Sequence, residues 1–64
     1  LMQVQYFIDD AILAGASQVR ILHGKGNGIL RQMIRQYLAT VPNVRSYRDE
    51  HVQFGGAGIT VVEL

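Results

Sequence analysis

His23 and Lys25 stand among three glycines in the stretch His23-Gly24-Lys25-Gly26-Asn27-Gly28. An apolar run, residues 18–22, precedes this stretch, and a helical pattern follows it at once. A histidine imidazole exchanges a proton near neutral pH, and a lysine ammonium attracts anions. These residue types therefore indicate a site for an anionic group, with His23 as a candidate proton donor or acceptor.

The glycines of this loop suit the close approach of a phosphate. Glycine adopts left-handed backbone conformations cheaply and lets an anion reach the backbone N–H groups. At the start of a helix these groups have no intrahelical acceptor, and the helix dipole adds partial positive charge. Asn27 tolerates a left-handed conformation and can cap the helix. The sequence predicts a phosphate-binding loop made of Gly24, Lys25, Gly26, Asn27 and Gly28. Arg31, in the first turn of the following helix, is expected to add a further phosphate contact.

Two phosphate-binding motifs do not fit this loop. A Walker A loop needs G-x-x-x-x-G-K-[ST], and the dinucleotide fingerprint spaces its glycines differently from the G-x-G-x-G found here. A second glycine cluster, residues 55–58, matches the Gly-x-x-Gly of nucleic-acid-binding KH domains, but it precedes a strand, so we interpret it as a turn. The alternative for residues 23–28 is a purely structural turn, in which His23 hydrogen-bonds the backbone and moves no proton.

Phosphodiester cleavage is the chemistry that these residues could support. It requires stabilisation of charge on the phosphorus oxygens and help for the nucleophile and the leaving group. His23 is a candidate general acid or base, and Lys25, Arg31 and the loop amides could stabilise the developing charge. Water attack on DNA usually uses a metal ion and carboxylates, and we expect no carboxylate beside the loop. We expect residues 49–51, Asp-Glu-His, to be solvated, and we predict no metal site.

The basic residues occupy one segment of the chain. All six Lys and Arg lie between positions 20 and 48, no Asp or Glu occurs in that span, and the net charge of the whole chain is only +1. This asymmetry predicts a basic face for a polyanion. The alternative is a set of solvated cations with no common direction. The candidate nucleic-acid contacts outside the glycine loop are Arg20, Arg31, Arg35, Arg45 and Arg48.

Length and composition limit the classes of protein. A chain of 64 residues is enough for one small domain. An apolar content of 48% and a small net charge argue against disorder. The absence of cysteine excludes disulfides, thiolate metal sites and a cysteine nucleophile. No apolar run reaches membrane length, and nothing resembles a signal peptide, so we expect a soluble, cytoplasmic protein with no membrane contact.

The pattern of apolar residues predicts the elements that position the loop. We expect a helix over residues 2–14, a strand over 18–22, a second helix over 28–40, an edge strand over 44–48, a loop over 49–57 and a strand over 58–64. The last strand is nearly continuously apolar, which predicts burial on both sides and pairing with the edge strand. This order favours an α/β sheet. The first helix begins without an N-cap, so we expect a piece of a longer domain.

The run VRILHGKGNGILRQMIRQYL resembles the central signature of the Smr (small MutS-related) domain. There a hydrophobic strand leads into H-G-K-G-T-G and a Leu-Arg pair on a helix, and Asn27 stands in place of the usual Thr. The ending GGAGITVVEL resembles that domain's last glycine-rich loop and strand, so the resemblance covers the whole chain. Within the family, the chain is most similar to the C-terminal domain of the second bacterial MutS paralogue, a recombination-suppressing endonuclease.

The resemblance implies a two-layer α/β sandwich, with two helices on a small mixed β-sheet. The family order is β-α-β-α-β-β, with the last strand internal and the third at an edge. The family's first strand and its Leu-Asp-x-[Arg/His]-Gly motif, whose Asp is linked to nuclease activity, are missing here. We therefore expect residues 1–64 to be a single Smr-like domain, a C-terminal fragment of a larger protein.

The resemblance also implies a function. It indicates a nucleic-acid-binding, nicking endonuclease domain for DNA, with RNA or the ribosome left open, inside a MutS-like ATPase of DNA recombination and repair. Its catalytic residues would be His23 and Lys25. It implies no cofactor in this chain, leaves a divalent metal for cleavage open, and places ATP elsewhere in the full-length protein. The alternatives are a non-catalytic nucleic-acid or ribosome docking module and a small-anion or protein-interaction domain. A bare sheet edge would permit a homodimer.

Overall fold

The computed structural model describes all residues from 1 to 64. Its elements are α1 (Met2–Leu13), β1 (Gln18–Leu22), α2 (Ile29–Leu38), β2 (Ser46–Asp49), two short 3-10 helices η1 (Val52–Phe54) and η2 (Gly56–Gly58), and β3 (Ile59–Glu63). The predicted order of helices and strands is confirmed, and each boundary lies within two residues of its predicted position. The shift in β2 matters most, because it moves Asp49 from the expected loop onto the sheet.

The three strands form one sheet in the order β1-β3-β2, and both strand pairs are antiparallel. The last strand is therefore internal and β2 lies at an edge, as expected. β1 and β2 run in the same direction, but β3 lies between them, so these residues contain no parallel pair and the sheet here is not mixed. Neither α1 nor α2 combines the length and the apolar character of a membrane-spanning helix.

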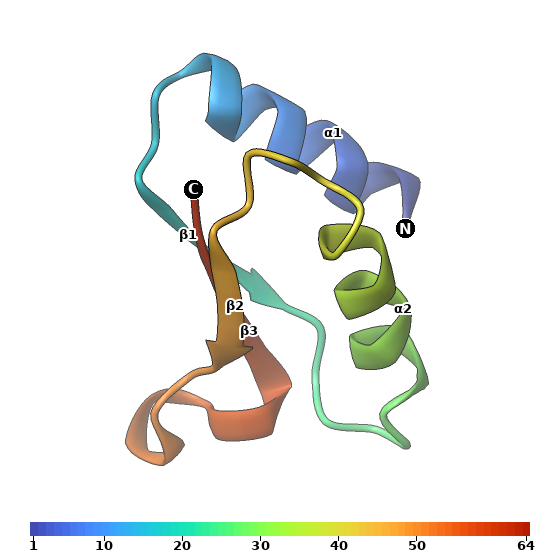
Figure 1. The fold of residues 1–64 in the computed structure, drawn as a ribbon. Helices are drawn as coiled ribbons and strands as arrows, with labels where there is room; N and C mark the ends of the chain where they lie inside the picture. The colour runs from blue at the N-terminus through green and yellow to red at the C-terminus, as the bar shows by residue number, and fades with distance from the viewer.

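Both helices cover the same face of the sheet, which gives the expected two-layer α/β sandwich (Figure 1). The core contains one buried residue from α1, two from α2 and two from the sheet: Ile8, Ile34, Leu38, Ile21 and Val62. Partly buried neighbours extend this set at the spacing that each element requires: Val4 and Ile12 lie four positions from Ile8, and Val19 lies two positions from Ile21.

Strand β3 is buried on both faces, as its apolar sequence predicts. Thr60 and Val62 face the helices and are fully buried. Val61 points to the other face and is still only 3% exposed. Arg20 and Arg48 lie directly opposite it on the two flanking strands, and the apolar stems of such side chains can cover a neighbour.

Candidate phosphate-binding and catalytic site

The loop between β1 and α2 has the backbone geometry expected of an anion-binding turn. Gly24 and Gly28 have left-handed φ angles of 79° and 84°, which other residues rarely adopt. Asn27 is not left-handed, but its side-chain Oδ1 accepts a hydrogen bond from the Ile29 N–H at 3.1 Å. Gly28, and not Asn27, is therefore the N-cap residue of α2, although the Asn27 side chain still pairs the first helical N–H. The N–H groups of the next two residues, Leu30 and Arg31, have no protein acceptor and remain available to an anion.

The second glycine cluster holds this loop in place. The backbone N–H groups of His23 and Gly24 both donate to the carbonyl oxygen of Gly58, at 3.1 and 3.0 Å. Residues 55–58 form turns that lead into β3, so their interpretation as a turn is confirmed. Two glycine segments that lie far apart in the sequence thus adjoin at one end of the sheet.

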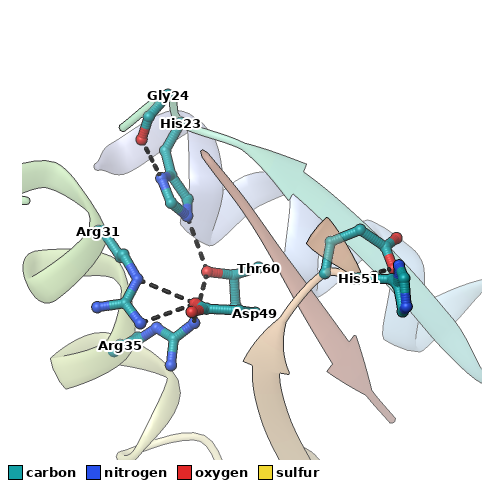
Figure 2. Close-up of polar contacts among 8 residues, drawn as sticks. His23, Gly24, Arg31, Arg35, Asp49, His51 and Thr60 are labelled. Atoms are coloured by element: carbon teal, nitrogen blue, oxygen red, sulfur yellow. Dashed lines mark hydrogen bonds and ion pairs between the residues drawn. The ribbon is translucent and has the colours of Figure 1, made fainter. Parts of the chain in front are cut away.

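Both ring nitrogens of His23 have partners within the protein (Figure 2). Nδ1 lies 2.8 Å from the carbonyl oxygen of Gly24, and Nε2 lies 2.8 Å from the Thr60 Oγ1. A carbonyl oxygen can only accept, so Nδ1 carries the proton in the neutral ring. Nε2 is then the acceptor, and the Thr60 hydroxyl donates to it. The ring is held in one tautomer with its basic nitrogen turned toward β3.

The Thr60 hydroxyl continues into a charged cluster on α2 and β2 (Figure 2). Arg35 Nη2 donates to Thr60 Oγ1 at 3.3 Å and to Asp49 Oδ1 at 2.6 Å. Arg31 donates to the same Asp49 oxygen from Nε at 3.1 Å and from Nη2 at 2.7 Å. The expectation that no carboxylate lies beside the loop was wrong: the register places Asp49 opposite Thr60, on the face that carries the helices.

The electrostatics of this cluster favour anions. A hydrogen bond from Arg31 is the largest cause that holds the pKa of Asp49 below its ordinary value, and the charges of Arg31 and Arg35 act in the same direction. Two arginines therefore face one carboxylate, and Lys25 on the adjacent loop has no ion-pair partner. Arg35 Nε is buried without an acceptor, and such an unpaired donor costs roughly 1–3 kcal/mol. An arrangement selected only for stability would have little reason to keep that cost.

The other predicted basic contacts do not join this site. Arg20 and Arg48 point to the opposite face of the sheet, because their strand positions alternate with those of the site residues. Arg20 pairs with Glu50 at 2.5 Å and Arg48 with Glu63 at 3.3 Å. Arg45 precedes β2 at the far end of the strand, and its Nε donates to the carbonyl oxygen of Leu64 at 3.1 Å. A single basic face made by all six cations is therefore not present.

The acidic segment after β2 does not converge on one point. Asp49 faces the helices, whereas Glu50 reaches Arg20 on the other side. His51 uses its Nδ1 to accept the Gln53 N–H at 3.2 Å. No group of three His, Cys, Asp or Glu side chains lies close enough to hold a metal ion.

A polar groove lies beside the charged cluster, between α2 and β2. Its volume is about 620 Å³, and its lining includes Asn27, Gly28, Arg31, Gln32, Arg35 and Tyr47. The Arg35 guanidinium lies 5.8 Å from the centre of the Tyr47 ring. The groove runs from the glycine loop along α2, and its volume exceeds that of a single phosphate group.

Sequence reasoning missed two residues of this site, Thr60 and Asp49. The one available signal for Thr60 was a hydroxyl inside the otherwise apolar run ITVVEL, since a fully buried polar side chain needs a partner. Nothing local distinguished Asp49 from its neighbour Glu50, because only the strand register decides which of them faces the loop.

The fold and the site define a class of protein: a small two-layer α/β domain with a glycine loop, a histidine and an arginine pair at one end of its sheet. The Smr domain family model matches residues 1–64, so this chain belongs to the Smr domain family. It is 50% identical over its full length to Endonuclease MutS2 of Caldicellulosiruptor bescii and to Endonuclease MutS2 of Shouchella clausii. The chain spans only 8% of the length of each of these relatives.

A solved structure has the same fold. The crystal structure of the Smr domain of Thermus thermophilus MutS2 is 43% identical to this chain and aligns with a TM-score of 0.94. The match covers 98% of this chain and 79% of that one. At this identity and coverage the similarity extends to the whole arrangement of helices and strands.

Proposed function

We propose that this domain binds the phosphodiester backbone of nucleic acid at the glycine loop and nicks it, as the endonuclease domain of a MutS-like ATPase. The observation that carries the proposal is the hydrogen-bonded network that joins His23 to the Arg31–Arg35 pair through Thr60 and Asp49, beside the loop that carries Lys25. The names of the relatives support an endonuclease context. A cytoplasmic location, and ATP bound elsewhere in the full-length protein, belong to the same proposal.

Some residues of the site bind the phosphate, and others transfer protons. The unpaired N–H groups of Leu30 and Arg31 in the first turn of α2, together with the arginine pair, hold the phosphate and stabilise its developing negative charge. His23 Nε2 exchanges its hydrogen bond from Thr60 for one from the nucleophile, a water or a ribose 2′-hydroxyl, and takes its proton. The new phosphorus–oxygen bond forms as the bond to the leaving oxygen breaks, and Lys25 gives that oxygen a proton.

The donor set of this site does not fit a divalent metal ion. Asp49 is the only carboxylate in it, and its Oδ1 already accepts three N–H donors from two guanidinium groups. Divalent cations such as Mg²⁺ need several oxygen ligands, and fixed positive charges close by oppose their binding. We therefore derive no catalytic step through a metal held by these residues.

A second function, non-catalytic docking on nucleic acid or the ribosome, is favoured by one observation. His23 has protein partners on both ring nitrogens, so its ring could serve only to tie the loop to β3. The binding residues would then be the same, and only cleavage would be lost. Self-association through the bare sheet edges would alter neither assignment.

Fluorescence anisotropy with labelled single- and double-stranded DNA and RNA tests binding, and a denaturing gel of the same samples tests cleavage. We expect binding that weakens with salt, and product that disappears in His23→Ala while binding persists. His51→Ala is the matched control, because His51 is the other histidine and lies outside the site. Arg45→Gln is the charge control for Arg31→Gln, since Arg45 lies at the far end of β2.

The outcomes separate the candidate functions. Binding with cleavage supports the endonuclease. Binding without cleavage by any variant supports the docking module. Absence of binding to all four nucleic acids would refute both and leave only a family fold. Equal loss of affinity in Arg31→Gln and Arg45→Gln would contradict the location of the phosphate site.

A further inference from the structure

The Asp49 carboxylate sits where the arginine pair would hold an anionic ligand. One of its two oxygens, Oδ1, accepts three hydrogen bonds at 2.6–3.1 Å, two from Arg31 and one from Arg35. Its other oxygen has no hydrogen-bond partner within the protein. Two cations thus share one oxygen of one anion, which leaves them able to bind a group with more oxygens. A phosphate offers at least two unesterified oxygens in the same fork geometry that arginine matches well.

Asp49 is also placed so that it can leave. It is the last residue of the edge strand β2, and its side chain is 41% exposed. Ion pairs at this level of exposure contribute little net stability in water. The other two ion-paired carboxylates differ, because Glu50 and Glu63 are only 17% and 22% exposed and each pairs with one arginine on the opposite face of the sheet.

An open path leads to the arginine pair from the groove beside α2. Arg31 and Arg35 line this groove together with Asn27 and Gly28 of the glycine loop. A nucleic-acid backbone in the groove would bring one phosphate to the unpaired N–H groups at the start of α2 and the next to the guanidinium groups. Asp49 is the only acidic side chain paired with these groups.

We propose that Asp49 occupies the place of a substrate phosphate on Arg31 and Arg35. It blocks phosphate binding there until nucleic acid displaces the Asp49 carboxylate. This inference rests on the proposed function, because it assigns Arg31 and Arg35 to the bound backbone. The free energy of breaking the two ion pairs is subtracted from the affinity, so Asp49 weakens binding of single phosphates and favours a chain of phosphates that engages the loop as well. Asp49, which lies just after the basic segment 20–48, therefore makes this site select polynucleotides over single phosphates.

Asp49→Asn tests the proposal, with Asp10→Asn as the matched control. Both changes remove one negative charge, but Asp10 lies on the exposed side of α1 and has no side-chain partner. Arg31 and Arg35 pair with Asp49. Together with Lys25 of the glycine loop, they give the proposed site a net charge of +2 in the wild type and +3 in Asp49→Asn. The log–log salt slope on duplex DNA should therefore steepen from about −1.8 to about −2.7. Between 50 and 200 mM salt, this means about a 12-fold loss of affinity in the wild type and about a 40-fold loss in the variant.

At low salt we expect Asp49→Asn to bind labelled duplex DNA several-fold more tightly than the wild type, and Asp10→Asn to bind like the wild type apart from a small long-range effect. Equal or weaker binding by Asp49→Asn, with an unchanged slope, would overturn the proposal and make Asp49 an orienting group for the arginines. Asp49→Ser is the second variant, and a circular-dichroism melt of each variant confirms that it is folded.

A titration with inorganic phosphate separates this proposal from the proposed function. Phosphate should shift the Nε–H resonances of Arg31 and Arg35 at lower concentration in Asp49→Asn than in the wild type. If that occurs and no variant binds nucleic acid, the proposed function is wrong and the displacement of Asp49 stands. If all variants bind nucleic acid alike and phosphate shifts are the same, the role of Asp49 is wrong and the proposed function stands.

Discussion

Replacement of Thr60 by valine would remove the hydroxyl of this residue and keep its volume, so it would test the hydrogen bonds of Thr60 apart from its packing. Thr60 is fully buried, and valine has nearly the same shape, so the core around it should stay packed. The change removes the hydrogen bond to His23 Nε2 at 2.8 Å and the weaker one from Arg35 at 3.3 Å. Two bonds at about 1 kcal/mol each, less about 1 kcal/mol regained from burying a methyl group, give a net loss near 1 kcal/mol. Thr60→Val should therefore remain folded.

The effect on cleavage should be larger than the effect on stability. The Thr60 hydroxyl keeps the His23 ring oriented until the nucleophile replaces it at Nε2. Without this hydroxyl, only the Gly24 carbonyl orients the ring before the nucleophile binds, and the ring can turn about that one bond. Loss of alignment by about 1 Å costs on the order of 100-fold in rate. We expect single-turnover cleavage at saturating protein to fall about 10- to 100-fold, with the dissociation constant for DNA unchanged.

Thr60→Ser is the matched comparison, because it keeps the hydroxyl and loses the methyl group. It should be as unstable as Thr60→Val, or more so, yet cleave near the wild-type rate, so stability and activity should rank in opposite orders. A folded Thr60→Val that cleaves at the wild-type rate would refute the positioning role. If the wild type shows no cleavage, the ¹⁵N resonance of His23 Nε2 still reports whether valine removes its donor.

Three further predictions concern stability, the loop and the core. The hydrogen bond from Gln18 is the largest cause that lowers the pKa of Glu63. The Glu63 carboxylate therefore contributes its full stabilisation above the ordinary glutamate pKa near 4.3, and this stabilisation is lost as the pH falls through the lowered pKa. The difference in melting temperature between the wild type and Glu63→Gln should be largest at pH 7 and should disappear in acid. Gly28→Ala and Gly15→Ala both place a side chain at a left-handed φ in open space and should each cost about 1–2 kcal/mol in melts, but only Gly28→Ala should weaken DNA binding in anisotropy titrations. Ile34→Ala should cost about 2–5 kcal/mol and largely unfold a domain of this size by circular dichroism, whereas Ile34→Val should cost only about 1 kcal/mol.

The elements were predictable because their signals are local. The apolar spacing in residues 2–13, the short run Gln18–Leu22 and the pattern after Gly28 each depend on neighbours within a few positions. The glycine loop was predictable for the same reason, since left-handed glycines and a capping Asn27 are properties of that segment alone. Burial of the last strand also followed from its own composition.

The residues that complete the site were not predictable from local patterns. Thr60 lies 37 positions from its partner His23, and Asp49 lies 18 positions from Arg31. A shift of one residue in the β2–β3 register would turn Asp49 to the other face and bring Glu50 to the arginines. The prediction of one basic face from the six cations was wrong for the same reason. Side chains alternate between the two faces along a strand, so Arg20 and Arg48 lie on the face opposite the loop site.

The sequence by itself determined the kinds of element, their order, the glycine loop with its histidine and lysine, and the resemblance to the Smr domain. Only the tertiary structure decided which charges meet. Three acidic residues from outside the basic segment, Asp49, Glu50 and Glu63, form ion pairs with four of its arginines. The fold also joins His23 to Thr60, Arg35 and Asp49 in one hydrogen-bonded chain. The physical reason is that secondary structure depends on periodicity within a segment, whereas a site depends on the register between segments.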